Sequence, residues 1–224
     1  MTREEIIKKY ILKHHKGIEV SPWHNPIVAK KEGYNVQILD IFDTPTLIER
    51  FKADTKVAKK NVDNIEHVDF VESALNIDKV VDEINGLGTY DYIISSHNFE
   101  HLPNPIKFLQ SSAKVLKVGG HLSMAIPTKI YTFDYFRRLT TTADFLEMFF
   151  ENREKPSPYQ IYEFFSNSIN NNPNRSKFKL KFKKNIEFNQ DFLSCFEDLR
   201  NSLKKIHLNT LMFMYQFLPQ IHSI

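Results

Sequence analysis

The sequence predicts an α/β protein with a mostly parallel sheet, helices on both faces, and a helical, aromatic carboxyl-terminal appendage. Five short apolar runs alternate with stretches of helical periodicity, a pattern that produces parallel sheets with right-handed crossovers. The 224 residues suffice for one sizeable domain plus an appendage, because a single core grows to roughly 250 residues before it splits. We expect residues 1–128 to form the core and 129–224 an appendage that completes the same domain.

The first expected elements are a short helix and two strands. Thr2 followed three residues later by Glu5 is a capping-box pattern, which predicts a helix at the amino terminus. A buried strand is expected at 17–20, and a second apolar strand at 34–42 carries Asp40 near its carboxyl end. The dozen residues between these strands leave room for a loop and a short crossover helix.

The middle of the chain continues the alternation. Thr44-Pro45 is typical of a helix start, because Thr is a good cap and Pro fits the first turn. A strand at 67–71 and a helix at 76–86 follow. The continuous apolar run at 90–96 is typical of a parallel strand that is buried on both faces.

The last core elements are a helix over 106–116, which we expect to end at Gly119 and Gly120, and a strand at 121–127. Beyond this strand the regular alternation is lost. The aromatic-rich segment that follows predicts a helix from about Asp134.

Composition indicates a soluble protein of the cytoplasm. Hydrophobic residues make up 42% of the chain, mean hydropathy is −0.39, and no apolar run approaches the ~20 residues of a membrane span. Residues 1–15 alternate charged and apolar positions, unlike a signal peptide. The single cysteine, Cys195, excludes an internal disulfide and a Cys-rich zinc site.

The net charge of +3 is mild, and its densest basic segment is 175–184. Lysines alternate there with apolar residues, which is typical of an edge strand that lysines protect against mispairing. A nucleic-acid surface is the alternative reading. We expect no nucleic-acid partner, and the sequence leaves the oligomeric state open.

Acidic residues follow the first two strands at a spacing used by nucleotide-binding proteins. Glu19 and Asp40 are separated by about the distance at which an acid reaches ribose hydroxyls in a βαβ unit, and two carboxylate oxygens suit two hydroxyls. The loop between them departs from that pattern, because Ser21 and Trp23 stand where glycines are usual.

Four blocks in order carry a family resemblance: GIEVSPWHNPIVAKKEGYNVQILD, YDYIISSHNFEHLPNP, LKVGGHLSMAIP and YTFDYFR. Over roughly residues 15–140 the chain resembles the class I S-adenosylmethionine-dependent methyltransferases, in a bacterial branch found among polysaccharide-biosynthesis genes. The resemblance implies a Rossmann-like sheet of seven strands. It also implies S-adenosylmethionine as methyl donor, S-adenosylhomocysteine as product, and no metal.

The resemblance assigns the cofactor contacts by position. It implies that the first loop holds the methionine end, the acid of the second strand the ribose, the residues after the third strand the adenine, and the loop after the fourth strand the sulfonium. The implied residues are Gly17, Glu19, Ser21, His24, Asn25, Asp40, Ser73, Ala74, Leu75, Ser96, His97 and Asn98. Because S-adenosylmethionine has no pyrophosphate, glycine is less necessary in the first loop than in dinucleotide folds.

The segment HNFEH at 97–101 has two readings. It matches the inverted zinc-peptidase pattern, which needs both histidines on one face of a regular helix. The apolar strand before it and the prolines after it make such a helix unfavourable. In a methyltransferase, His101 is a candidate general base for a hydroxyl acceptor, or a residue that only orients the loop.

A basic and aromatic cluster follows the fifth strand and suggests the acceptor site. Its members are Lys129, Tyr131, Tyr135, Arg137 and Arg138. Guanidinium groups bind phosphates and carboxylates, so the cluster favours a small anionic acceptor. Together with the resemblance, this implies O-methylation of a small anionic sugar or phospho-metabolite in capsule or surface-polysaccharide biosynthesis. A solvated helix face is the plainer reading of the arginines. A noncatalytic methyltransferase-like protein that binds cofactor or a partner is the alternative function.

Overall fold

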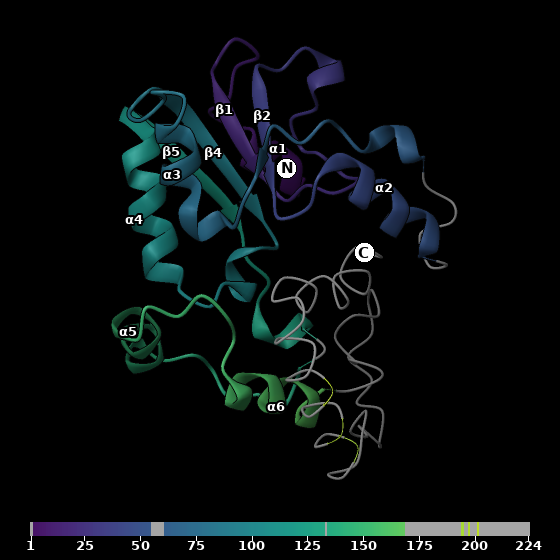
Figure 1. The fold of residues 1–224 in the computed structure, drawn as a ribbon, viewed down its shortest axis with the longest axis vertical. Coiled ribbons are helices and arrows are strands. Elements are labelled where there is room, and N and C mark those ends of the chain that lie inside the picture. The colour runs from purple at the N-terminus through teal and green to yellow at the C-terminus, as the bar shows by residue number, and fades with distance from the viewer. Residues whose placement is uncertain are drawn as a thin grey trace. The chain divides into compact units, whose positions relative to one another are not determined.

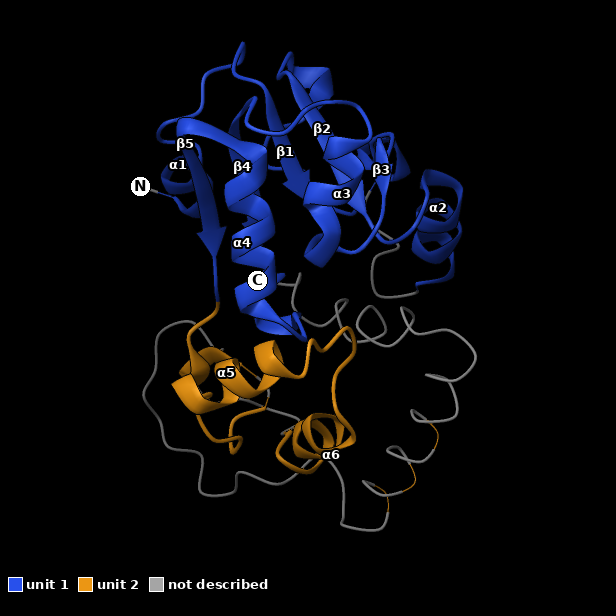
Figure 2. Cartoon of the chain, turned by 60° about the vertical axis from the view of Figure 1, so that its left-hand side comes forward, with its two compact units in different colours: residues 1–126, 219–224 blue, residues 127–218 orange. Residues whose placement is uncertain are grey.

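The computed structural model describes residues 2–54, 61–132 and 134–168, together with Ser194, Glu197 and Asn201. The described residues divide into two compact units, one ending at Ile126 and one beginning at Pro127 (Figure 2). Unit 1 contains every strand of the described sheet, and unit 2 contributes helices. No helix in these described ranges is long and apolar enough to cross a membrane.

The elements of unit 1 are α1 (Arg3–Ile7), β1 (Gly17–Val20), η1 (Lys30–Glu32), β2 (Val36–Asp40), α2 (Thr44–Ala53), η2 (Val62–Asn64), β3 (Phe70–Val71), η3 (Ala74–Asn76), α3 (Ile77–Asp82), β4 (Tyr90–Ser96), η4 (Phe99–His101), α4 (Pro105–Val115) and β5 (Leu116–Ala125). Those of unit 2 are η5 (Lys129–Tyr131), α5 (Thr142–Phe150) and α6 (Pro158–Ser166). The η elements are 3-10 helices.

The five strands form one parallel sheet in the order β3-β2-β1-β4-β5; Figure 1 labels four of them and Figure 2 labels β3 as well. In the register, Glu19 of β1 lies beside Ile38 of β2 and Ile94 of β4. The chain order reverses at the centre, between β1 and β4. In open parallel sheets, ligands bind outside the carboxyl ends of the strands at such a switch point. The predicted α/β fold with a Rossmann-like parallel sheet is confirmed.

Both faces of the sheet carry a hydrophobic core. On one face Ile38 packs with residues of α1 and α2, including Phe51. On the other face Ile18 and Ile93 pack with residues of α3 and α4, including Phe108. Neighbouring residues of β1 and β4 alternate between these cores, because successive strand side chains point to opposite faces. The expectation of helices on both faces is therefore confirmed.

Several element boundaries differ from the sequence-based expectation. The strands expected at 34–42 and 67–71 are shorter, and the helix expected at 76–86 is η3 followed by α3. The expected crossover helix between the first strands is the 3-10 helix η1. The helix expected at Thr44 begins there, but its N-cap is Asp43, whose carboxylate accepts from the Thr46 amide at 3.0 Å.

The expected role of the glycine pair was wrong. Gly119 and Gly120 do not end the helix, since α4 ends at Val115 and Leu116 already has extended dihedral angles. Both glycines lie within β5, where its register against β4 shifts. Gly119 has a φ of 81°, and a Cβ at Gly120 would lie 2.9 Å from the Tyr90 carbonyl oxygen. Glycine is therefore required by a strand irregularity.

The expectation of a helix from Asp134 was also wrong. Residues 134–141 are irregular, and α5 begins at Thr142 behind a capping box in which the Thr141 hydroxyl accepts from the Asp144 amide at 3.3 Å. Consecutive threonines are poor helix formers, and threonine is a preferred N-cap, so the helix starts after them. The lysine-rich segment 175–184 lies outside the described residues, as do any strands beyond the five.

Candidate functional site

The loop after β1 has glycine-like backbone geometry without glycine. Ser21 and Trp23 have φ angles of 50° and 49°, in the left-handed region that side chains disfavour. Each such residue costs on the order of 1–3 kcal/mol and persists only where its surroundings impose the conformation. The loop therefore keeps the turn that the missing glycines would provide, and the strain lies at the sheet's switch point.

Glu19 holds the segment after this loop through hydrogen bonds to its backbone amides. Its side chain is buried, and its two carboxylate oxygens accept hydrogen bonds from the amides of Ile27 at 2.8 Å and Val28 at 3.1 Å. Burial raises the pKa of Glu19 to about 7, with the two amide hydrogen bonds acting in the opposite direction. In the structure Glu19 is thus an anchor of the first loop.

Asp40 lies at the carboxyl end of β2 and is fully buried. Its Oδ1 accepts from the Phe42 amide at 3.0 Å, and the Ser21 amide donates to the Leu39 carbonyl at 2.8 Å. This backbone contact brings the end of β2 beside the strained first loop. A carboxylate has about four acceptor positions, and in the expected cofactor site this one would face the ribose hydroxyls.

The residues after β3 form a short capped turn. The Ser73 hydroxyl accepts from the Leu75 amide at 3.3 Å, and the side chains of Ala74 and Leu75 are buried in the core. An adenine ring would therefore meet their backbone and the neighbouring surface. Val71, at the carboxyl end of β3, exposes 54% of its surface.

A second strained turn follows β4. His97 has a φ of 53°, and its amide donates to the Ala125 carbonyl at 2.9 Å. Ser96 ends the strand beside Ala125 of β5, while Asn98 donates from Nδ2 to the Ser95 hydroxyl at 3.2 Å. The expected sulfonium loop, Ser96 to Asn98, thus lies directly at the carboxyl end of β4.

Three ionisable side chains meet just beyond this turn. Glu100 Oε1 lies 3.5 Å from His97 Nδ1 and 3.9 Å from His101 Nε2. The segment forms η4, a 3-10 helix of three residues, so it lacks the regular helix that the zinc-peptidase reading requires. Within the described ranges no group of three or more His, Cys, Asp or Glu side chains is arranged to hold a metal ion.

Three expected cofactor residues lie elsewhere or face inward. Gly17 is at the amino end of β1, where an added Cβ would come within 2.0 Å of the Tyr92 ring, so it serves packing. His24 is buried, with its ring 4.7 Å from that of Trp23. Asn25 follows in a turn, in which its amide donates to the Pro22 carbonyl at 2.9 Å.

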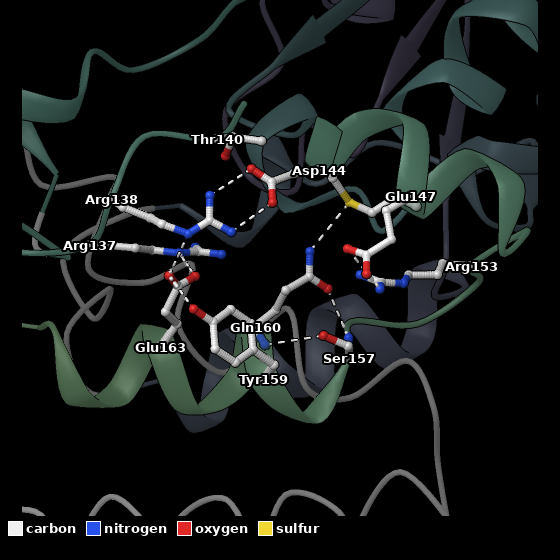
Figure 3. A pocket seen from close by; sticks show the side chains of 11 residues that line it. Arg137, Arg138, Thr140, Asp144, Glu147, Arg153, Ser157, Tyr159, Gln160 and Glu163 are labelled. Carbon is white, nitrogen blue, oxygen red and sulfur yellow. Dashed lines mark hydrogen bonds and ion pairs between the residues drawn. The ribbon is translucent and has the colours of Figure 1, made fainter. Parts of the chain in front are cut away.

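Unit 2 contains a pocket of about 320 Å³ with a polar, charged lining (Figure 3). Two of the expected acceptor residues, Arg137 and Arg138, line it. The other lining residues are Thr140, Asp144, Glu147, Met148, Arg153, Ser157, Tyr159, Gln160 and Glu163. The three arginines are matched by three carboxylates, so the lining carries no net charge.

Ion pairs occupy both expected arginines. Arg138 binds Asp144 through two hydrogen bonds of 2.7 Å and lies 3.3 Å from Glu163. Arg137 donates to Glu163 at 3.2 Å and lies 3.5 Å from Asp134. Figure 3 shows Glu163 reaching both guanidinium groups. An anionic ligand would have to compete with these carboxylates.

The other expected acceptor residues, Lys129, Tyr131 and Tyr135, are not part of this arginine network. Lys129 donates from Nζ to the Tyr135 carbonyl at 2.7 Å and lies 5.9 Å from the centre of the Tyr135 ring. Tyr131 is half-exposed in η5. Neither Lys129 nor the two tyrosines line the pocket described above. Unit 2 therefore separates the expected acceptor residues into a paired arginine network and a lysine-tyrosine contact.

Comparison with known proteins gives one family. No curated protein matches. A solved structure from Galdieria sulphuraria, described provisionally as a sarcosine dimethylglycine methyltransferase, is 21% identical with a TM-score of 0.30. The similarity covers 51% of this chain and only 38% of that one, and it carries no argument about substrate. A family described as a methyltransferase domain matches residues 13–166, which is more than half of the chain and includes β1 to β5. The chain therefore belongs to the methyltransferase domain family.

Proposed function

We propose that the protein transfers a methyl group from S-adenosylmethionine to an oxygen atom of a small metabolite and releases S-adenosylhomocysteine. The proposed setting is capsule or surface-polysaccharide biosynthesis in the cytoplasm, with an anionic sugar or phosphorylated metabolite as acceptor. Family membership supports methyl transfer in general, and the polysaccharide setting rests on the four sequence blocks quoted above.

One observation carries the proposal for the cofactor. The buried carboxylate of Asp40 and the strained residues Ser21, Trp23 and His97 all follow strands of one parallel sheet on its carboxyl side, next to the switch point between β1 and β4. Strained backbone and buried charge both reduce stability, so proteins retain them mainly where function needs them. S-adenosylmethionine would supply an electrophilic methyl group on sulfur at this edge.

The residues of this edge have distinct proposed tasks. Asp40 accepts hydrogen bonds from the ribose hydroxyls, and Glu19 acts indirectly by holding the first loop through the amides of Ile27 and Val28. The turn at His97 directs the backbone below the reacting centre. Alignment of nucleophile and methyl group is the main requirement of such a reaction, because effective molarity arises from orientation.

Residues of unit 2 support the proposed anionic acceptor. Arg137 and Arg138 support an anionic group on the acceptor. Arg137 already pairs with Glu163 and Arg138 with Asp144, so the binding free energy of a ligand anion is only the difference between its own contacts and the ion pairs that it replaces. The half-exposed Arg138 is also screened by solvent. Oxygen as the nucleophile is supported by His101, a candidate general base for the hydroxyl proton.

The test is release of S-adenosylhomocysteine with paired neutral and phosphorylated sugars. We expect turnover with a phosphorylated member and a raised KM for it in Arg137→Ala, with unchanged S-adenosylmethionine affinity, the signature of a lost acceptor contact. Turnover with the neutral members alone would contradict the anionic acceptor. Cofactor binding without turnover on any acceptor would favour the noncatalytic alternative.

A further inference from the structure

A carboxylate lies between two imidazoles at the carboxyl end of β4. The same oxygen, Glu100 Oε1, is 3.5 Å from His97 Nδ1 and 3.9 Å from His101 Nε2. All three side chains are about one-fifth exposed. Both Glu100 oxygens are buried, and in the described part of the chain they accept no hydrogen bond of normal geometry. Among the described residues, the two histidine rings lie within ion-pair distance of this carboxylate.

The backbone on one side of this group is held in a strained shape. His97 has a φ of 53°, which a β-carbon disfavours, and its amide is tied to the Ala125 carbonyl of β5. A left-handed residue here lets the chain turn sharply from β4 into η4. That turn brings the imidazole of His97 back toward Glu100, three residues later. Strain of this kind is retained where it positions a functional group.

We propose that Glu100 is a positioning residue that sets the tautomers of both imidazoles. In the neutral rings the charge of this carboxylate, 3.5 Å from Nδ1 of His97 and 3.9 Å from Nε2 of His101, favours the tautomers that carry the proton on these two nitrogens. A neutral imidazole that donates from one nitrogen carries its lone pair on the other. The proton-accepting atoms are then Nε2 of His97 and Nδ1 of His101.

This inference rests on the proposed function where it concerns catalysis. When a hydroxyl is methylated, a carbon–oxygen bond forms, the carbon–sulfur bond breaks, and its electron pair stays on sulfur. The hydroxyl proton must go to a base, and we assign it to Nδ1 of His101. Glu100 then stabilises the imidazolium that results, as a carboxylate behind a histidine does in hydrolytic enzymes.

The tautomers can be read without an acceptor. The full chain labelled with ¹⁵N-histidine is treated with EDTA and measured at about pH 9, above the ordinary imidazole pKa of roughly 6.5. Two-bond proton–nitrogen couplings then report which nitrogen carries the proton, and single His→Gln variants assign the signals. His15 is an internal reference, because its Nδ1 accepts from the Leu12 amide at 3.2 Å and its proton must be on Nε2.

We expect His97 to carry its proton on Nδ1, opposite to His15, and His101 to carry it on Nε2. In Glu100→Ala the His97 proton should move to Nε2 while His15 stays unchanged. A wild-type His97 protonated on Nε2 would overturn the proposal, and this result does not depend on the folding of Glu100→Ala. A folded Glu100→Ala protein with an unaltered His97 signal would overturn it as well. Calorimetry with S-adenosylmethionine tests the proposed function separately, so the two failures are distinguishable.

Discussion

Two tyrosines of β4 differ in how their hydroxyl groups are satisfied. Tyr90 and Tyr92 are both buried residues. The Tyr90 hydroxyl donates to the side-chain oxygen of Gln37, whereas the Tyr92 hydroxyl has no hydrogen-bond partner among the described residues. Burial raises the pKa of Tyr90 to about 12 and that of Tyr92 still further, so both remain neutral donors at physiological pH.

This contrast predicts opposite effects of the same substitution. Tyr92→Phe removes an unsatisfied buried hydroxyl, so we expect the free energy of unfolding to rise by about 1 kcal/mol. Tyr90→Phe leaves Gln37 without its donor and should lower that free energy by about 1–3 kcal/mol. Urea denaturation of the two variants beside wild type measures both. Equal destabilisation would mean that the Tyr92 hydroxyl is paired in solution.

Glu19 gives the protein a pH-dependent stability. Its pKa rises from 4.5 to about 7 on folding, so between these values the folded state holds a proton that the unfolded state has lost. The Glu19 contribution to the free energy of unfolding is therefore greatest below about pH 4.5, falls as pH rises to about 7, and is constant above. The full change is on the order of 3 kcal/mol.

Glu19→Gln should remove this dependence. We expect the difference in unfolding free energy between wild type and Glu19→Gln to become less favourable to wild type from pH 5 to pH 8, by about 3 kcal/mol. Denaturant titrations at unit steps of pH measure this difference and cancel the contributions of other groups. A difference that stays constant over this range would contradict a raised pKa for Glu19.

For single residues, the sequence predicted where the acidic side chains of Glu19 and Asp40 lie better than it predicted what they bind. The positions of Glu19 and Asp40 at strand ends follow from apolar patterning. Glu19 holds the loop through Ile27 and Val28, which sequence cannot show because the contact depends on how the loop folds back. Gly17 was misread for a similar reason, since the ring that fills its space belongs to Tyr92, far along the chain.

At the scale of elements, the loop after β1 carries the clearest structural signal. Ser21 has a left-handed backbone, which glycine adopts without strain and β-branched residues strongly disfavour. We expect Ser21→Gly to leave the free energy of unfolding unchanged or to raise it by up to about 1 kcal/mol. Ser21→Val, which replaces the hydroxyl with two methyl groups on Cβ, should lower it by more than about 1 kcal/mol.

The same pair also tests the link between loop and cofactor. S-adenosylmethionine affinity should survive in Ser21→Gly and fall in Ser21→Val, because only the glycine variant keeps the loop geometry. Thermal unfolding and calorimetry on both proteins decide this. If valine were tolerated as well as glycine, the left-handed conformation would not be a feature of the folded loop.

Elements were predicted where periodicity was long and unbroken. The apolar run of β4 was predicted residue for residue, and the start of α4 was placed within one residue. The role of the glycine pair in β5 was predicted wrongly, because a register shift between neighbouring strands leaves no mark in a single sequence. The start of α5 was missed because three threonines interrupt an aromatic segment that otherwise resembles a helix.

At the scale of the whole molecule, chain order determines where chemistry gathers. Strands β1 and β4 are neighbours in space although β2 and β3 separate them in sequence. The loops after these two strands therefore start side by side, and both contain left-handed residues, Trp23 and His97 among them. The sheet thus explains why one edge combines strained backbone, buried carboxylates and the His97–Glu100–His101 group.

The binding site for the methyl acceptor is the feature that the sequence predicted least well. Arg137 and Arg138 were expected to bind an anionic acceptor, with a solvated helix face as the plainer reading, and their pairing with acids was not anticipated. In unit 2 they form a network with Glu163 on α6 and Asp144 on α5. Such pairing depends on how helices pack, which periodicity does not specify.

The most direct test of the central claim is calorimetry with S-adenosylmethionine on wild type, Asp40→Asn and Asp43→Asn. Asparagine at position 40 keeps an acceptor for the Phe42 amide but loses the charge proposed to bind ribose. Asp43 lies three residues on, caps α2, and serves as the matched control. We expect micromolar binding by wild type and Asp43→Asn, and roughly tenfold to hundredfold weaker binding by Asp40→Asn. No binding by wild type, or equal affinity in all three proteins, would contradict the proposed cofactor site.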